Sequence, residues 1–445
     1  MAVSNVNPPN DGYLYGKRNS YYVFALLFLL YMFDYIDRFI VAALIPYLKA
    51  DWALSDMQCG MLSSAVYWSI VVFSFPVSLL VDRWSRRKGI ALMAILWSLA
   101  TAAAAFTRSF GQLFVAKAFI GIGEAGYSPG GTAMLSALFP EGKRSQIIGF
   151  WNASIPLGYA VGTILGGFIA KTLGWRYAFG LVAIPGAIIG LLFLRVRDYK
   201  TIALTSTQAA KAHGAKDPSS KTPGLERALT KMEIAGRFLR TRSLVLTYVA
   251  FAGNMFVTAA LMMWLPTFFH RSYGLTMTEA GLRASGIMGM AILGAPLGGY
   301  VVDRWRRRYP NARLAFAAIA SFITATLLFV AFGLLDGWYQ YGVLMLAGLF
   351  AVAFSPAAIA VTQDVVHPGL RATSYALCVI VQNLLGSSLG PLFVGGVSDG
   401  FGLTRALAIV PVFTLISGFI YLLASRWYLQ DLAAVDRVEM EAEAR

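Results

Sequence analysis

The sequence predicts an all-α membrane protein in which twelve transmembrane helices form two pseudo-symmetric six-helix bundles. Three observations lead to this fold class: the composition, the length of the apolar runs and an internal repeat. Of the 445 residues, 58% are hydrophobic and 13% are charged, and the mean hydropathy is +0.63. Soluble domains carry about a quarter charged residues. This chain therefore lacks the polar residues that would cover a water-facing surface.

The apolar residues occur in runs of about 20 or more, the length that crosses a hydrocarbon core of about 30 Å. Because lipid cannot pair with exposed backbone groups, we expect each run to be helical. We expect spans in the first half near 20–47, 56–81, 89–106, 110–138, 146–170 and 175–195, and in the second half near 243–269, 278–302, 313–335, 338–364, 371–398 and 402–424.

Two patterns recur at the same places in both halves. The link after the second span reads D-R-W-S-R-R-K from Asp82, and the link after the eighth reads D-R-W-R-R-R from Asp303. A G-x-x-x-G pattern starts at Gly158 in the fifth span and at Gly386 in the eleventh. Two related six-helix halves are typical of transporters whose halves rock about a central site.

The positive-inside rule gives the expected orientation. The two basic links and the central stretch are rich in Lys and Arg, which places both termini in the cytoplasm. The expected division is an N-terminal bundle over 1–195, a cytoplasmic linker over 196–242, a C-terminal bundle over 243–425 and a cytoplasmic tail over 426–445. The end of the linker has helical spacing of apolar and basic residues. It predicts either a helix lying on the membrane surface or one packed beneath a half.

The net charge of +15 would suggest a nucleic-acid partner in a soluble protein. Here the charges lie between apolar runs, so we expect membrane lipids, protons and a small-molecule or lipid substrate as partners, no nucleic acid, and a monomer. The G-x-G-x-x-G match at 121–126 lies inside a span with no strand before it, and no Cys/His cluster occurs. We therefore expect no cofactor, no metal and no enzymatic activity.

The basic links resemble the signature loop of the major facilitator superfamily, G-x-x-x-D-R-x-x-R-R, in both halves. Gly299 fits the opening glycine of the second copy, and Ser78 stands there in the first. Two more stretches resemble the spinster branch of this superfamily: Asp37-Arg38 in the first span and G-I-G-E-A-G-Y-S-P over 121–129 in the fourth. Lys117 stands where this branch usually has Arg. Similar patterns also occur in symporters of small organic anions.

The resemblance implies a transporter that works by alternating access. Spinster-type proteins carry lysolipids and sphingolipid phosphates, and many are coupled to protons. The expected function is therefore proton-coupled secondary transport of a lysophospholipid or related amphiphilic anion, in a plasma membrane such as the bacterial inner membrane. The alternatives are proton-coupled symport of a small organic anion or sugar acid and, from another class, a membrane sensor that does not transport.

Five ionisable residues of the first half are expected to be buried inside the predicted spans. Buried charges cost several kcal/mol in a membrane, so each is a functional hypothesis. We expect Glu124, then Asp37 and Asp34, to be proton sites, with Arg38 and Lys117 as cations that pair with them or with an anionic substrate. The alternatives are a static ion pair between spans and, for Asp34, a solvated position near the external mouth.

Two further sets of residues complete the predicted site. The first comprises polar side chains that contact either the substrate or another helix: Tyr31, Tyr127, Asn152, Asn254, Gln382 and Asn383. The second lies in the basic links, which by resemblance stabilise the state closed to the cytoplasm and otherwise serve only orientation: Asp82, Arg83, Arg86, Arg87, Asp303, Arg304 and Arg307. In the second half, the spans contain no central charge comparable to Asp37 or Glu124, apart from Asp364 near a cytoplasmic end, which predicts an apolar wall there.

Overall fold

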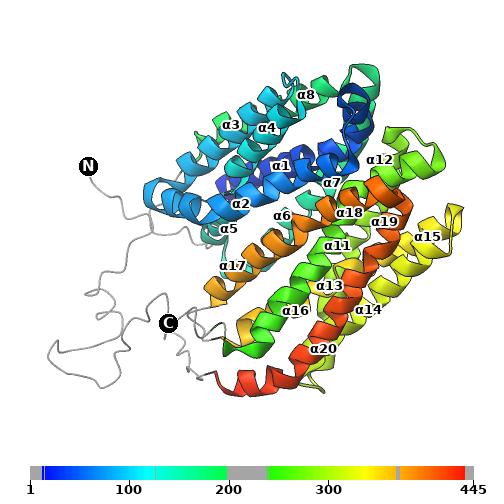
Figure 1. The fold of residues 1–445 in the computed structure, drawn as a ribbon. Coiled ribbons are helices and arrows are strands. Elements are labelled where there is room, and N and C mark those ends of the chain that lie inside the picture. Colours follow the sequence, from blue (N-terminus) through cyan, green and yellow to red (C-terminus); the bar gives the residue numbers. More distant parts are fainter. Residues whose placement is uncertain are drawn as a thin grey trace, which may run out of the picture.

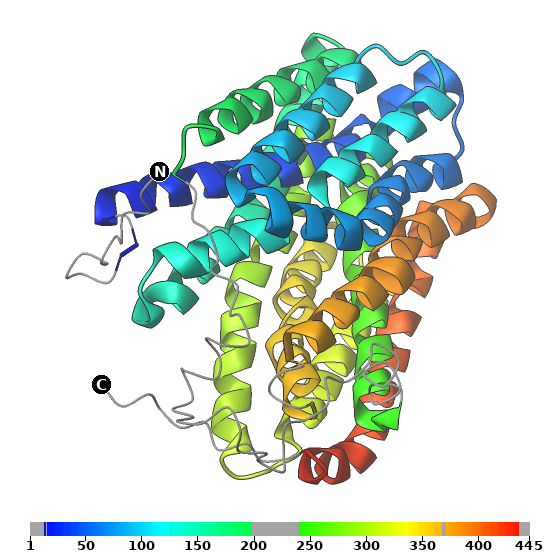
Figure 2. The same ribbon diagram turned by 90° about the vertical axis from the view of Figure 1, so that its left-hand side faces the viewer.

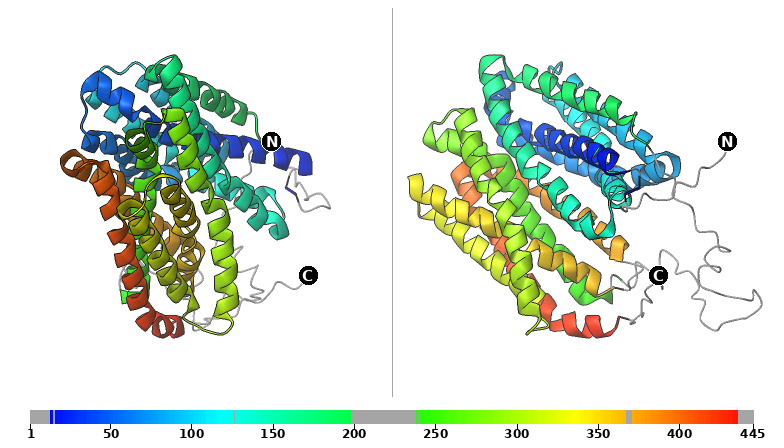
Figure 3. Two further views of the ribbon diagram at one scale, coloured as in Figure 1. Left: turned by 90° about the vertical axis from the view of Figure 1, so that its right-hand side faces the viewer. Right: turned by 180° about the vertical axis from the view of Figure 1, so that it is seen from behind.

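The computed structural model describes residues 13–14, 16–125, 127–197, 238, 240–366 and 371–435. Within these ranges all regular structure is helical, and ten helical segments are long and apolar enough to cross a membrane. The helices run side by side in two groups, one from each half of the sequence (Figures 1 and 3). The predicted all-α membrane fold is confirmed.

The first half begins with the long helix α1, which packs against α7 and α8, while α3 packs against α4 and α8. Serine side chains cap the starts of α2, α3 and α4 and accept backbone N–H groups that would otherwise lack partners. The predicted fourth and fifth spans each consist of two consecutive helices. The helices are α1 (Lys17–Trp52), α2 (Asp56–Trp84), α3 (Arg86–Ala104), α4 (Phe110–Glu124), α5 (Tyr127–Leu138), α6 (Glu141–Asn152), α7 (Ser154–Thr172) and α8 (Trp175–Phe193).

In the second half, α11 and α14 both pack against α20. The predicted eleventh span contains a π-helical stretch, η2, and the last span continues past its predicted end at 424. The helices are α11 (Arg242–Tyr273), α12 (Met277–Gly289), α13 (Ala291–Arg306), α14 (Ala312–Gly333), α15 (Gly337–Ala351), α16 (Ser355–Asp364), α17 (Arg371–Val381), η2 (Gln382–Ser387), α18 (Leu389–Phe401), α19 (Leu403–Ile409) and α20 (Pro411–Ala433). The predicted surface helix, 225–240, lies outside the described residues except for 238 and 240, which are helical.

The two halves meet through reciprocal helix pairs. Helix α2 packs against α18, and α7 packs against α12. These are the second and eleventh spans and the fifth and eighth, the exchange that a two-fold repeat produces. Glycines allow the close approach: a Cβ on Gly395 would lie 2.3 Å from the Asp56 carbonyl oxygen, and one on Gly60 would lie 2.4 Å from that of Pro391. Small residues therefore bring the two backbones into contact.

Candidate functional site

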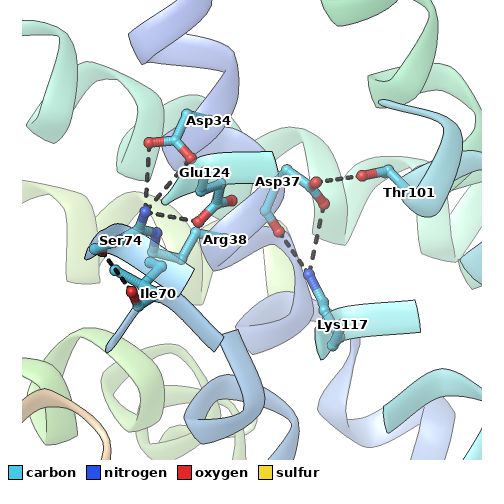
Figure 4. A network of polar contacts seen from close by, with 8 residues as sticks. All are labelled: Asp34, Asp37, Arg38, Ile70, Ser74, Thr101, Lys117 and Glu124. Carbon is cyan, nitrogen blue, oxygen red and sulfur yellow. Dashed lines mark hydrogen bonds and ion pairs between the residues drawn. The ribbon is translucent and has the colours of Figure 1, made fainter. Parts of the chain in front are cut away.

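The five charged residues predicted in the first half come together between α1 and α4 (Figure 4). Asp34, Asp37 and Arg38 project from α1, while Lys117 and Glu124 project from α4. The four residues other than Arg38 are at most 5% exposed, and the Arg38 side chain is 11% exposed. The solvated position considered for Asp34 is wrong, because that residue is 2% exposed.

Arg38 is held by two carboxylates and two aromatic rings. Its Nη2 donates to Glu124 Oε2 at 2.7 Å and to both oxygens of Asp34 at 3.4 Å. The guanidinium carbon lies 4.8 Å from the centre of the Tyr35 ring and 5.5 Å from that of Tyr67. Aromatic faces attract cations, and ionised partners shorten hydrogen bonds. The short contact identifies Glu124 as the main partner of Arg38.

Two polar atoms of this group are buried without a hydrogen-bond partner among the described residues: Oε1 of Glu124 and Nε of Arg38. Leaving a buried polar atom unpaired costs about 1–3 kcal/mol. The Glu124 carboxylate therefore has one oxygen engaged by Arg38 and one free to accept a proton. This is the chemistry that a proton-binding carboxylate needs.

A second ion pair lies beside the first. Lys117 Nζ donates to the backbone oxygen of Asp37 at 2.9 Å and lies 3.5 Å from its Oδ1, while the hydroxyl of Thr101 donates to Oδ2 (Figure 4). Both oxygens of Asp37 thus have donors, unlike those of Glu124. Sequence reasoning missed Thr101, a residue of α3 that a search for every uncharged polar residue within a span would have found.

The two predicted tyrosines belong to an aromatic cluster inside the first half. Tyr31 stacks on Trp151 with ring centres 4.3 Å apart. The Tyr127 hydroxyl and the Trp151 Nε1 both donate to the backbone oxygen of Leu27, at 2.5 Å and 3.2 Å. Both side chains therefore contact other helices, which is one of the two roles predicted for them. Sequence analysis selected Asn152 but overlooked its neighbour Trp151.

The four predicted amides do not converge. Asn254 is buried and donates to Ser321 Oγ at 3.0 Å, so it contacts another helix. Asn152 is exposed. Gln382 and Asn383 are half-buried at the start of η2. Because π-helical turns often occur at functional sites, these last two stay candidates for substrate contact.

The basic links are described only in part. The side chains of Asp82, Arg83 and Arg86 lie outside the described residues, and Arg87 Nη1 donates to the Val196 carbonyl at 3.1 Å. In the second half, the side chains of Asp303, Arg304 and Arg307 are exposed. Their gating role stays a prediction.

A polar cluster that sequence reasoning missed joins the two halves at the predicted external end. Asp56, at the start of α2, is 3% exposed. Its carboxylate accepts from both Nη atoms of Arg271 at 2.6 and 2.7 Å, from Lys49 at 2.6 Å and from Ser398 at 2.5 Å. Asp399 in turn accepts the Asp56 backbone N–H at 2.6 Å. In the sequence, the indication of this cluster was a carboxylate at the start of a predicted span, where the helix dipole stabilises negative charge.

Comparison with known proteins gives a consistent result. The sequence profile of the Major Facilitator Superfamily matches residues 27–391. The chain is 27% identical to Protein spinster of Drosophila melanogaster over 86% of its own length and 62% of that protein. It is 28% identical to an MFS-type efflux pump of Mycolicibacterium smegmatis, over 94% and 95% of the two chains. It is 26% identical to the sphingosine-1-phosphate transporter SPNS2 of Mus musculus, over 93% and 78%.

Solved structures share the fold. A bacterial homolog of the human lysosomal transporter spinster, in an inward-facing and unoccupied conformation, aligns with a TM-score of 0.79 at 23% identity, covering 94% of this chain and 99% of that one. A D-xylose–proton symporter aligns with a TM-score of 0.67 at 16% identity, covering 91% and 97%. The all-helical fold, with one group of helices from each half of the sequence, is therefore that of these solved structures.

Proposed function

The chain belongs to the major facilitator superfamily, and we propose that it is a proton-coupled transporter of a lysophospholipid or related amphiphilic anion. Members of this family are transporters and not enzymes, as the sequence predicted. The observation that carries the proton-coupling proposal is the buried pair of Arg38 and Glu124, 2.7 Å apart, in which one carboxylate oxygen has no donor.

The proposed switch is the protonation of Glu124. While ionised, the carboxylate holds Arg38 through a charge-assisted hydrogen bond, a type that contributes about 1.5–3 kcal/mol. A proton on the free oxygen removes the negative charge and weakens that bond. Arg38 is then available to an anion, with Asp34 as its remaining carboxylate partner at 3.4 Å. Proton binding and anion binding are thereby linked through one guanidinium.

The environment of Arg38 supports an amphiphilic anion as substrate. Its guanidinium is a bidentate donor suited to phosphate, and it is the one cation of the central five that is partly exposed. In the second half, Arg313 is the one charged residue that is buried among those described. One partly exposed cation in the first half, with no buried charge but Arg313 among the described residues of the second half, suits a charged headgroup with a hydrocarbon tail. The transporter SPNS2, whose name states sphingosine-1-phosphate as its substrate, is a relative that supports this class.

The contacts between the halves support alternating access. Hydrogen bonds between the halves, for the described residues, lie in the half of the bundle that the positive-inside rule places outside, from the Asp56 cluster to the Ser64–Ser388 contact. We infer that the external end is closed in this state. The Asp56–Arg271 pair is then a contact that must break when the halves rock toward the outward-open state.

Flux in proteoliposomes tests the substrate and the coupling together. The protein is reconstituted with an imposed pH gradient, and uptake of a fluorescent lysophospholipid is compared with uptake of a labelled small carboxylate. We expect lysophospholipid flux that rises with the gradient. Flux of the carboxylate alone would show that the substrate is a small organic anion and not a lysophospholipid. Absence of flux for a panel of both classes would favour a membrane sensor that does not transport. A thermal-shift screen of the same compounds reports binding separately, because ligands stabilise the state they bind.

A further inference from the structure

A cationic pocket lies at the end of the first half, away from the central ion pairs. It has a volume of about 560 Å³ and is lined by the first turn of α1 and by Arg197, which follows α8. The start of α1 and the end of α8 lie near each other in the fold (Figure 2). Arg38 lies 21 residues further along α1 than Lys17, which is about 30 Å at 1.5 Å per residue. The lining residues are Gly16, Lys17, Arg18, Asn19, Tyr22 and Arg197. The pocket is therefore separate from the proposed proton site.

The pocket contains positive charge that no described carboxylate balances. Lys17, Arg18 and Arg197 have exposed side chains, and none of them forms an ion pair within the described part of the chain. The first turn of α1 has no acidic residue, and its N-cap, Gly16, provides no side-chain acceptor. The positive end of the helix dipole therefore adds to the three cations.

A second, independent feature shows that an acceptor is missing. The Nδ2 atom of Asn19 is buried and has no hydrogen-bond partner among the residues that the structure describes. Buried donors in folded proteins nearly always have acceptors. The pocket thus combines three cations with a donor that has no acceptor among the described residues, and an anion with several oxygens would provide that acceptor.

The two walls of the pocket are fixed by contacts outside it. The Ser20 hydroxyl donates to the Leu138 carbonyl at 3.2 Å, which ties the first turn of α1 to the end of α5. Arg87 donates to the Val196 carbonyl at 3.1 Å, which holds the residue just before Arg197. The cations are therefore placed by the protein fold before any anion binds.

We propose that this pocket binds the phosphate of an anionic phospholipid headgroup from the adjoining leaflet. Tyr22 is 46% exposed at its edge, and tyrosines are enriched where a membrane protein crosses the headgroup region. Basic pockets at the cytoplasmic side of helix bundles are known to take anionic headgroups. Inorganic phosphate offers the same chemistry without acyl chains, so it is the other possible source of the anion.

Native mass spectrometry of the detergent-purified full chain tests this proposal. The protein is titrated with phosphatidylglycerol and with phosphatidylcholine of identical acyl chains. We expect one phosphatidylglycerol to be retained in preference. Lys17→Gln/Arg18→Gln/Arg197→Gln should weaken its retention about a hundredfold, since each cation near the membrane contributes roughly a factor of five. A matched control removes three exposed arginines that do not line the pocket: Arg240→Gln/Arg308→Gln/Arg426→Gln.

Three outcomes decide the matter. Loss of retention in the pocket variant alone supports the site, and restoration by Lys17→Arg/Arg18→Lys/Arg197→Lys shows that charge is the cause. Equal retention of both lipids, or equal loss in the control variant, overturns the site. A rise in melting temperature with inorganic phosphate that the pocket variant lacks would make free phosphate the ligand instead of lipid. If the triple variant does not purify, Arg197→Gln alone should lose about fivefold.

Discussion

Replacing Glu124 by Gln tests the proposed proton site most directly. The amide keeps the size of the side chain but can carry neither the negative charge nor the transported proton. It therefore imitates a permanently protonated Glu124. Because Glu124 Oε2 is the shortest contact of Arg38, at 2.7 Å, the substitution removes the main interaction that holds the guanidinium and leaves Asp34 as its carboxylate partner.

The magnitude follows from that one contact. A hydrogen bond between charged groups contributes about 1.5–3 kcal/mol to the state that contains it. At about 1.4 kcal/mol for each factor of ten, its loss shifts the equilibrium between conformations with and without the pair by about 10- to 150-fold. We expect Glu124→Gln to favour, at every pH, the conformation without this pair, which the unsubstituted protein favours only at low pH.

Two assays measure the expected effect. In proteoliposomes, the ratio of initial uptake rates with and without a pH gradient should fall to about one in Glu124→Gln, while it stays well above one in the unsubstituted protein. Distances between spin labels at the cytoplasmic ends of the two halves should no longer change with pH. Asp51→Asn is the matched control, because its ion pair with Arg176 is 43–45% exposed and such surface pairs contribute little. A wild-type gradient ratio in Glu124→Gln would refute the assignment.

Three other substitutions probe the remaining structure. Asp37→Asn should abolish gradient-driven flux and lower the melting temperature, because it leaves Lys117 buried without its partner at a cost of about 3–5 kcal/mol. Adding Lys117→Met should restore the melting temperature but not the flux. An unchanged melting temperature in Asp37→Asn would contradict this. Gly395→Ala should lengthen spin-label distances across the external end, since its Cβ would lie 2.3 Å from a carbonyl of α2. Gly396→Ala is the control and should leave them unchanged, because its Cβ meets nothing nearer than 3.9 Å. Arg271→Ala should raise the population that is open at the same end by about fivefold, because Arg271 is 33% exposed and Lys49 stays paired with Asp56. Equal distances in Arg271→Ala and the unsubstituted protein would exclude a closing role.

The fold was predictable because a membrane leaves few choices. An apolar run of 20 residues has to be helical in lipid, so the runs alone gave the spans. The breaks within spans were less predictable. The division of the predicted span 146–170 into α6 and α7 falls between Asn152 and Ser154, where Pro156 of the first turn of α7 has no N–H to pair with the Asn152 carbonyl. A proline alone does not predict such a break, because Pro76 and Pro185 lie inside the unbroken helices α2 and α8. Such a break depends on packing with neighbouring helices, which the local sequence does not state.

The charged part of the site was predictable for an energetic reason, and its neutral part was not. A charge within a span is costly, so Glu124 and Asp37 are conspicuous in the sequence. Thr101 carries no charge and incurs little cost, yet it donates to Asp37. Asp56 was overlooked because it starts a helix, where a solvated carboxylate is ordinary, and because its partner Arg271 lies 215 residues away. The type of a residue and its place in a span predict whether its side chain is buried better than they predict which residue it contacts.

The two buried ion pairs also differ in a way that assigns them separate tasks. Both oxygens of Asp37 have donors, so this pair can join α1 to α4 throughout the cycle. Glu124 has a free oxygen, so its bond with Arg38 can be released by a proton. That release contributes about 1.5–3 kcal/mol. The external end is closed by the five hydrogen bonds of the Asp56 cluster that join the two halves, and at about 0.5–1.5 kcal/mol each they contribute more together. A ligand shifts an equilibrium only by its differential affinity. We therefore expect that a proton alone leaves the external end closed, and that proton and substrate together supply enough free energy to open it.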